Sequence, residues 1–96
     1  MVIAEKPGWT FLSNHAHILL FLSVEPEARI RDIGDAVGLT ERAVQRIIGE
    51  LAEEGVLQIT RTGRRNRYRI NSSSHLRHPL ESHRTVRDLL RLVSHR

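Results

Sequence analysis

Apolar residues fall at helical spacing through the first half of the chain and alternate with polar residues after it. A strongly apolar stretch from His15 to Val24 predicts a first helix at the centre of the fold. Ser13 or Asn14 can cap this helix, and Pro26 ends it because proline cannot continue the helical hydrogen-bond ladder. Its predicted inner face consists of Ala16, Leu19, Leu20 and Ser23, widened by Ile18 and Phe21.

The next two helices flank a sharp turn at Gly38. Residues 29–37 predict a helix of about two turns, which Gly38 ends in a left-handed conformation. Thr40 then caps the following helix through its side-chain oxygen, and Gly55 closes that helix. Ala36 is small, which lets the two helices cross closely. The expected buried stripes are Ile30, Ile33, Ala36 and Val37 in one helix, and Val44, Ile47, Ile48 and Leu51 in the other.

A β-hairpin and a last helix follow. Residues 56–61 and 67–71 alternate apolar and polar side chains, and residues 62–66 between them have turn composition. Leu57, Ile59, Tyr68 and Ile70 are expected to face the helices. After the polar linker 72–74, Pro79 is placed to begin a last helix. Its apolar stripe would consist of Leu80, His83, Val86, Leu89, Leu90 and Val93.

This order of elements predicts a mostly α protein with a small β-hairpin, in the α+β class. A chain of 96 residues fits one structural domain. We divide it into residues 1–74, which hold an N-terminal arm, a three-helix core and the hairpin, and residues 75–96, which hold the C-terminal helix. The start of the chain lacks the basic-then-apolar order of a secretory signal, and no apolar run approaches the roughly 20 residues that span a bilayer.

The charge of the chain is divided unevenly between its parts. Residues 1–60 hold 5 Lys/Arg and 9 Asp/Glu, whereas residues 61–96 hold 10 Arg and 2 Asp/Glu. Because arginine binds phosphate and guanine through two parallel hydrogen bonds, a polyanionic partner fits this composition. A solubilising surface is the alternative. The absence of cysteine excludes a disulfide framework and fits a reducing cytosol, so we predict a cytoplasmic protein without a membrane partner.

The residues around the turn carry a resemblance to a known group of proteins. The signature is Ile33-x-x-Ala36-Val37-Gly38-Leu39-Thr40-x-x-Ala43-Val44, continued by Ile47, Ile48, Leu51 and Gly55-Val56-Leu57. It resembles the winged helix-turn-helix transcriptional regulators, especially the MarR-like and ArsR-like groups. The segments 9–16 and 77–83 look like those of small stand-alone prokaryotic members.

The resemblance implies two DNA-binding elements. The helix after the turn would be the recognition helix in the major groove, with Thr40, Arg42, Ala43, Gln45 and Arg46 facing DNA. The hairpin would be the wing on the DNA backbone or in the minor groove, with Arg61, Thr62, Arg64, Arg65, Asn66 and Arg67 as its contacts. The alternatives are an ordinary solvated helix face and a basic edge hairpin that resists aggregation.

The predicted function is therefore a DNA-binding transcriptional regulator, acting as a homodimer on palindromic sites of double-stranded DNA. The apolar stripe of residues 80–93 would form the dimer interface, the alternative being packing onto its own domain. A protein–protein adaptor and an RNA-binding module are the other functions that this scaffold serves. The six histidines do not form a zinc-ligand pattern, and no catalytic motif is present, so we predict no metal, no cofactor and no enzymatic activity.

Overall fold

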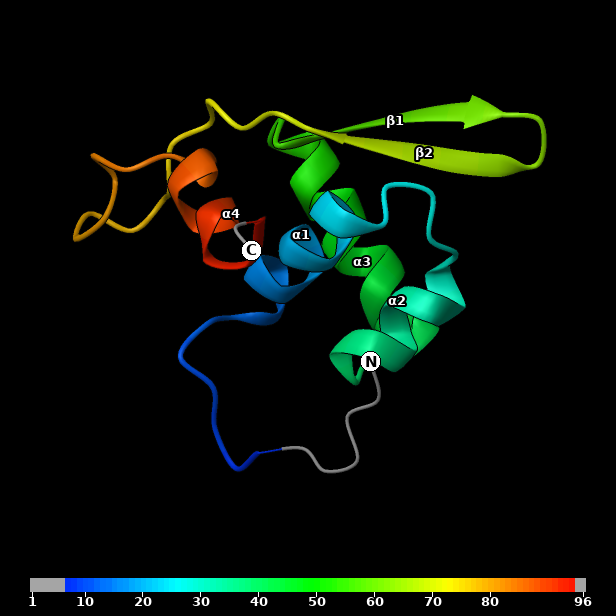
Figure 1. Cartoon of the computed structure of the whole chain (residues 1–96), viewed down its shortest axis with the longest axis horizontal. Helices are drawn as coiled ribbons and strands as arrows, with labels where there is room; N and C mark the ends of the chain where they lie inside the picture. The colour runs from blue at the N-terminus through cyan, green and yellow to red at the C-terminus, as the bar shows by residue number, and fades with distance from the viewer. Residues whose placement is uncertain (1–6, 95–96) are drawn as a thin grey trace.

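The structure, a computed structural model, describes residues 7–94 as helices arranged around a central helix, with a β-hairpin that extends beyond them (Figure 1). The elements follow in the order α1 (Asn14–Val24), α2 (Ile30–Val37), α3 (Glu41–Glu53), β1 (Leu57–Thr62), β2 (Arg65–Ile70) and α4 (Val86–Ser94). Helix α1 contacts the other three helices and β2. The predicted α+β class is confirmed. Residues 1–6 of the expected N-terminal arm and residues 95–96 lie outside the described part of the chain, and the division at residue 74 stays a prediction.

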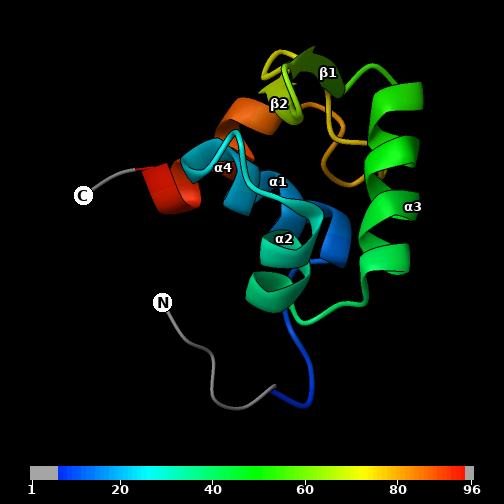
Figure 2. The ribbon, with the colours of Figure 1, turned by 90° about the vertical axis from the view of Figure 1, so that its right-hand side faces the viewer.

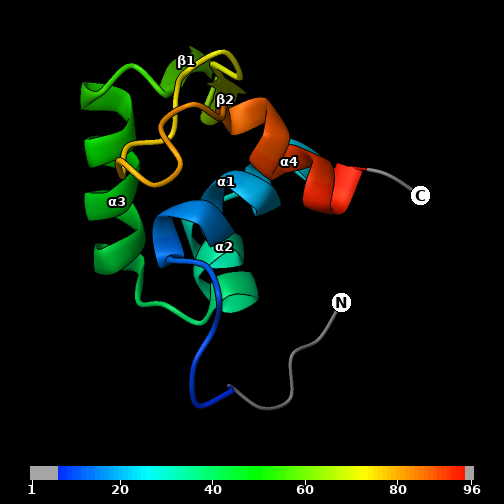
Figure 3. The ribbon, with the colours of Figure 1, turned by 90° about the vertical axis from the view of Figure 1, so that its left-hand side faces the viewer.

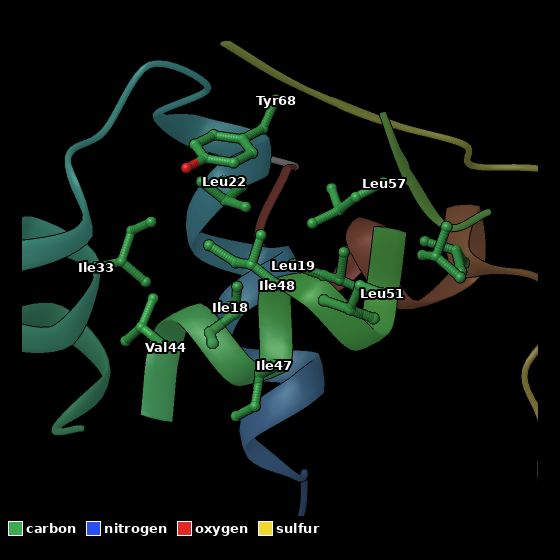
Figure 4. Packing of buried hydrophobic residues seen from close by; sticks show 12 residues of the cluster. Ile18, Leu19, Leu22, Ile33, Val44, Ile47, Ile48, Leu51, Leu57 and Tyr68 are labelled. Atoms are coloured by element: carbon green, nitrogen blue, oxygen red, sulfur yellow. The ribbon is translucent and has the colours of Figure 1, made fainter. Parts of the chain in front are cut away.

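Helix α1 begins where the sequence predicted and buries Ile18 and Leu19 of the predicted face, together with Leu22, which was not predicted. The Ser13 hydroxyl oxygen accepts a hydrogen bond from the Ala16 N–H, at 3.3 Å, and so caps the helix. Ile18 and Leu22 are fully buried, whereas Leu20 is only half-buried. Because α1 is apolar on nearly every side, the periodicity of its sequence did not determine its orientation. Figure 4 shows Ile18 among residues of α3 and Leu22 beside Tyr68.

The turn between α2 and α3 is fixed by a close approach of two backbone segments. Gly38 has φ 86°, the predicted left-handed conformation, and its N–H donates to the Gly34 carbonyl at 2.7 Å. The Leu39 N–H donates to the same carbonyl at 2.9 Å. A Cβ at Gly34 would lie 2.7 Å from the Leu39 carbonyl oxygen. The turn therefore requires a residue without a Cβ at Gly34, and the role expected of Ala36 stays a prediction.

The hairpin turns more tightly than the sequence suggested. Thr62 pairs with Arg65, which leaves a turn of two residues with Gly63 in the first position, as in a type II′ turn. Arg65 and Asn66 consequently belong to β2 instead of the turn. The Tyr68 N–H donates to the carbonyl of Pro26 at 2.8 Å and ties β2 to the loop between α1 and α2.

The apolar face of the hairpin is covered by helices along only part of its length. Leu57 and Tyr68 are buried and Ile70 is half-buried, as expected. Ile59 lies on the same face but remains 41% exposed, because the hairpin extends past the helices that cover its base. The prediction that Ile59 packs on the helices is thus only partly right.

The last helix begins seven residues later than predicted, at Val86 instead of Pro79. The residues from Pro79 to His83 form turns within a loop that closes where the Val86 N–H donates to the Ser74 carbonyl, at 2.8 Å. The Asp88 carboxylate accepts the Thr85 N–H at 3.1 Å, so Thr85 and Asp88 cap the helix start. Helix α4 packs on α1 (Figure 3).

In the described residues, no helix is long and apolar enough to cross a membrane.

Replacement of Gly34 by alanine is expected to destabilise the protein by about 1–3 kcal/mol, because its methyl group would collide with the Leu39 carbonyl. The free energy of unfolding from urea titration measures this change. Gly49→Ala is the matched control, since nothing lies within 4 Å of its Cβ position and alanine favours the helix by up to about 1 kcal/mol. Equal stability of the two variants would contradict the role given to Gly34.

Candidate nucleic-acid interface

The outer face of α3 is polar and open to solvent. Thr40, Arg42, Gln45 and Arg46 are exposed and Ala43 is half-buried. This orientation follows from the opposite face, where Val44, Ile47, Ile48 and Leu51 are buried in the core as predicted. The Thr40 hydroxyl oxygen caps the helix by accepting the Ala43 N–H at 3.1 Å. Figure 2 shows α3 along one side of the domain, with its outer face uncovered by any other element.

Arg46, one of the predicted recognition residues, is held by an ionic network that also includes Glu50 and His15. Arg46 Nη1 lies 3.1 Å from Glu50 Oε2, and the other carboxylate oxygen, Oε1, lies 2.7 Å from His15 Nε2. The hydrogen bond with His15, followed by the effects of Arg46, lowers the pKa of Glu50 below its ordinary value. The network joins α3 to the first turn of α1. Sequence reasoning missed His15 because His15 and Glu50 are 35 residues apart in the chain.

The strand register divides the predicted wing residues between the two faces of the hairpin. Since side chains alternate along a strand, Thr62, Arg65 and Arg67 share one face, and Arg61 and Asn66 lie on the other face with Tyr68. Arg67 donates to Glu27 at 2.5 Å and is thereby neutralised within the chain. Among residues 7–94, no carboxylate forms an ion pair with Arg61, Arg64 or Arg65.

The fold brings one further arginine to the hairpin. Arg29, directly before α2, lines a hollow together with Arg61, Arg64 and Arg65. Sequence reasoning assigned Arg29 to a helix and gave it no functional role. Arg29 lies near the hairpin because the hydrogen bond between Tyr68 and Pro26 places β2 against the loop before α2. The sequence gives no sign of this contact.

The predicted dimerisation residues do not lie on a single helical stripe. Leu80 and His83 are exposed in the loop before α4, with Leu80 82% exposed. Leu89 and Leu90 are half-buried against the core, and Val93 is 36% exposed. Val86 is 3% exposed and packs in the core of its own chain, so it is not available to a second chain. The stripe predicted from Pro79 onward is wrong because residues 79–83 are not helical.

Comparison with known families decides the nature of the domain. Residues 13–58 match a family model described as winged helix-turn-helix DNA-binding. The domain has the winged helix-turn-helix fold. The match runs from the cap of α1 through the turn and α3 to the start of β1, and it confirms the resemblance predicted from the signature around Gly38.

A solved structure shares the fold of this winged helix-turn-helix domain. It is a zinc-responsive MarR family member, ZitR of Lactococcus lactis, which matches with a TM-score of 0.54 and 19% sequence identity. The match covers 74% of this chain and 51% of that chain, so this chain spans about half the length of the matched structure. No curated protein matches the chain. The part of the chain that the structure describes contains no group of three or more His, Cys, Asp or Glu residues that could hold a metal ion.

The network around Glu50 is expected to make stability depend on pH. A carboxyl group whose pKa is lowered by folding contributes stability above its unfolded pKa, near the ordinary 4.5, and loses this contribution as the pH falls through the folded value. The difference in unfolding free energy between wild type and Glu50→Gln should therefore shrink on acidification from neutral pH. Urea titrations over this range measure it.

Glu53→Gln is the matched control, because it removes the same charge from α3 without breaking the network. A difference between wild type and Glu50→Gln that stays constant or grows on acidification would show that the network does not act on stability in this way.

Proposed function

We propose that this protein binds double-stranded DNA and regulates transcription. The observation that carries the proposal is the outer face of α3, where Arg42, Gln45 and Arg46 are exposed directly after the turn in a winged helix-turn-helix domain. A major groove about 12 Å wide admits an α-helix, and the first turns of a recognition helix reach the base edges. The matched family binds DNA and is not an enzyme family, and a cytoplasmic location goes with this function.

In this proposal each residue on α3 has a contact that its chemistry favours. Gln45 binds adenine, and Arg42 or Arg46 binds guanine, each bidentate contact discriminating by about 1–3 kcal/mol. Ala43 meets a thymine methyl group, and Thr40 contacts a phosphate at the start of the helix. Glu50 orients Arg46 through the ion pair, so that its guanidinium reaches the groove from a fixed position.

The hairpin supplies the part of the affinity that does not depend on sequence. Arg61, Arg64 and Arg65 lie near its tip without ion-pair partners in the described residues, and they contact the backbone or a narrow minor groove. Thr62 and Asn66 add hydrogen bonds at the same tip. Arg67 contributes less than its neighbours, since Glu27 already neutralises it.

We propose further that two chains pair through the C-terminal region and bind palindromic half-sites about 34 Å apart. Leu80, Leu92 and Val93 leave apolar surface exposed there, and Leu92 is 64% exposed. Sedimentation equilibrium should give twice the chain mass of 11.0 kDa for the wild type and the single mass for Leu92→Glu. A wild type that sediments as a single chain would exclude this dimer.

Arg65→Ala and Gln45→Ala are expected to weaken DNA binding in different ways. Arg65→Ala should lower affinity for all duplexes alike and reduce the slope of log affinity against log salt by about 1, because it removes one phosphate contact. Gln45→Ala should cost about 1–3 kcal/mol on the preferred site only, because it removes base recognition. Gel shifts on selected and scrambled duplexes over a range of salt measure both effects.

Arg77→Ala is the control for this experiment, because it removes an exposed arginine outside α3 and the hairpin. Loss of affinity equal to that of Arg77→Ala, or binding that does not depend on salt, would count against the proposal. An RNA duplex that competes as well as DNA, with Gln45→Ala neutral, would point to the RNA-binding alternative.

A further inference from the structure

A hollow of about 340 Å³ lies between the hairpin and the start of α2. Arg61, Arg64 and Arg65 line it from the hairpin, and Arg29 lines it from the residue before α2. The two sides are held together at their base, where the buried Tyr68 donates its backbone N–H to the Pro26 carbonyl. The hollow is therefore a feature of the folded domain and does not depend on the hairpin bending toward the helices.

The charges around the hollow are strongly unbalanced. Four arginines line it, and the one acidic residue in its lining, Glu27, already accepts a hydrogen bond from Arg67. None of the four forms an ion pair with a carboxylate in residues 7–94. Positive charges gathered in this way repel one another, and an anion between them would replace the repulsion with charge-assisted hydrogen bonds.

The chemistry of the lining favours a phosphate group over other anions. A guanidinium donates two parallel hydrogen bonds to phosphate oxygens, and a phosphate offers enough acceptors for several guanidinium groups. Asn66 adds a side-chain amide to the same lining. All four arginines are exposed, so the hollow is open to solvent and can receive a phosphate that is attached to a larger molecule.

We propose that this hollow is a phosphate-binding site in which Arg29 completes a cluster with Arg61, Arg64 and Arg65. The phosphate belongs either to the DNA backbone, in which case the inference rests on the proposed function, or to a small free phosphate compound. In both cases Arg29 is a binding residue, and one anion joins the start of α2 to the hairpin.

The test compares Arg29→Ala with Arg31→Ala, which removes an exposed arginine two residues further along α2 that does not line the hollow. One arm measures heat on titration with inorganic pyrophosphate. The other arm measures affinity for duplex DNA over a range of salt concentrations. Arg29→Lys, which keeps the charge without the bidentate geometry, shows whether a loss comes from binding rather than from folding.

A free phosphate ligand predicts saturable pyrophosphate binding that weakens about tenfold in Arg29→Ala and less in Arg29→Lys, with Arg31→Ala unchanged. A backbone phosphate predicts instead that only DNA affinity falls in Arg29→Ala, on all sequences alike, with the salt slope reduced by about 1. Either pattern supports the site. Equal behaviour of Arg29→Ala and Arg31→Ala in both arms would overturn it.

The two proposals fail in distinguishable ways. If the wild type binds DNA but neither arm separates Arg29 from Arg31, the phosphate site is wrong and the proposed function stands. If the wild type does not bind DNA while pyrophosphate binding depends on Arg29, the site stands and the proposed function is wrong.

Discussion

The contact between Gly34 and the Leu39 carbonyl is the constraint on which the exposed polar face of α3 depends. Two backbone N–H groups, those of Gly38 and Leu39, donate to the Gly34 carbonyl, and there is no room for a Cβ between the two segments. This crossing sets the direction in which α3 leaves the turn. The core then requires that Val44 and Ile47 point inward, so the polar side of α3 has to face solvent.

The arginines of the domain divide into those that the chain neutralises and those that it leaves without a partner. Arg46 pairs with Glu50 and Arg67 pairs with Glu27, and both contacts position a side chain more than they stabilise the fold, because exposed ion pairs contribute little. Arg29 and the arginines near the hairpin tip have no such partner in the described residues. This unpaired group is where a polyanion gains most by binding.

Local signals in the sequence were sufficient for the first three helices and the turn. Ser13 and Thr40 are caps, and Gly38 is left-handed, because each of these roles depends only on residues a few positions away. The sequence did not determine the inner face of α1, which is apolar on nearly every side and is oriented by its partners. It also misplaced the last helix, since the apolar spacing from Leu80 onward concealed the cap formed by Thr85 and Asp88.

The sequence predicted only those parts of the candidate site that depend on residues close together in the chain. The exposed residues of α3 follow from the period of a single helix. The neighbours of Arg61 and Glu50 do not, because Arg29 and His15 reach them only through the tertiary fold. The roles of these residues toward DNA are proposals that the geometry supports.

Backbone amide shifts measured by NMR while a duplex is added test the central claim most directly. If the turn presents α3 and the hairpin to one duplex, the largest shifts will fall on residues 40–46 and 61–66, with small shifts in residues 75–85. Shifts gathered in residues 75–85, with residues 40–46 unchanged, would contradict the account.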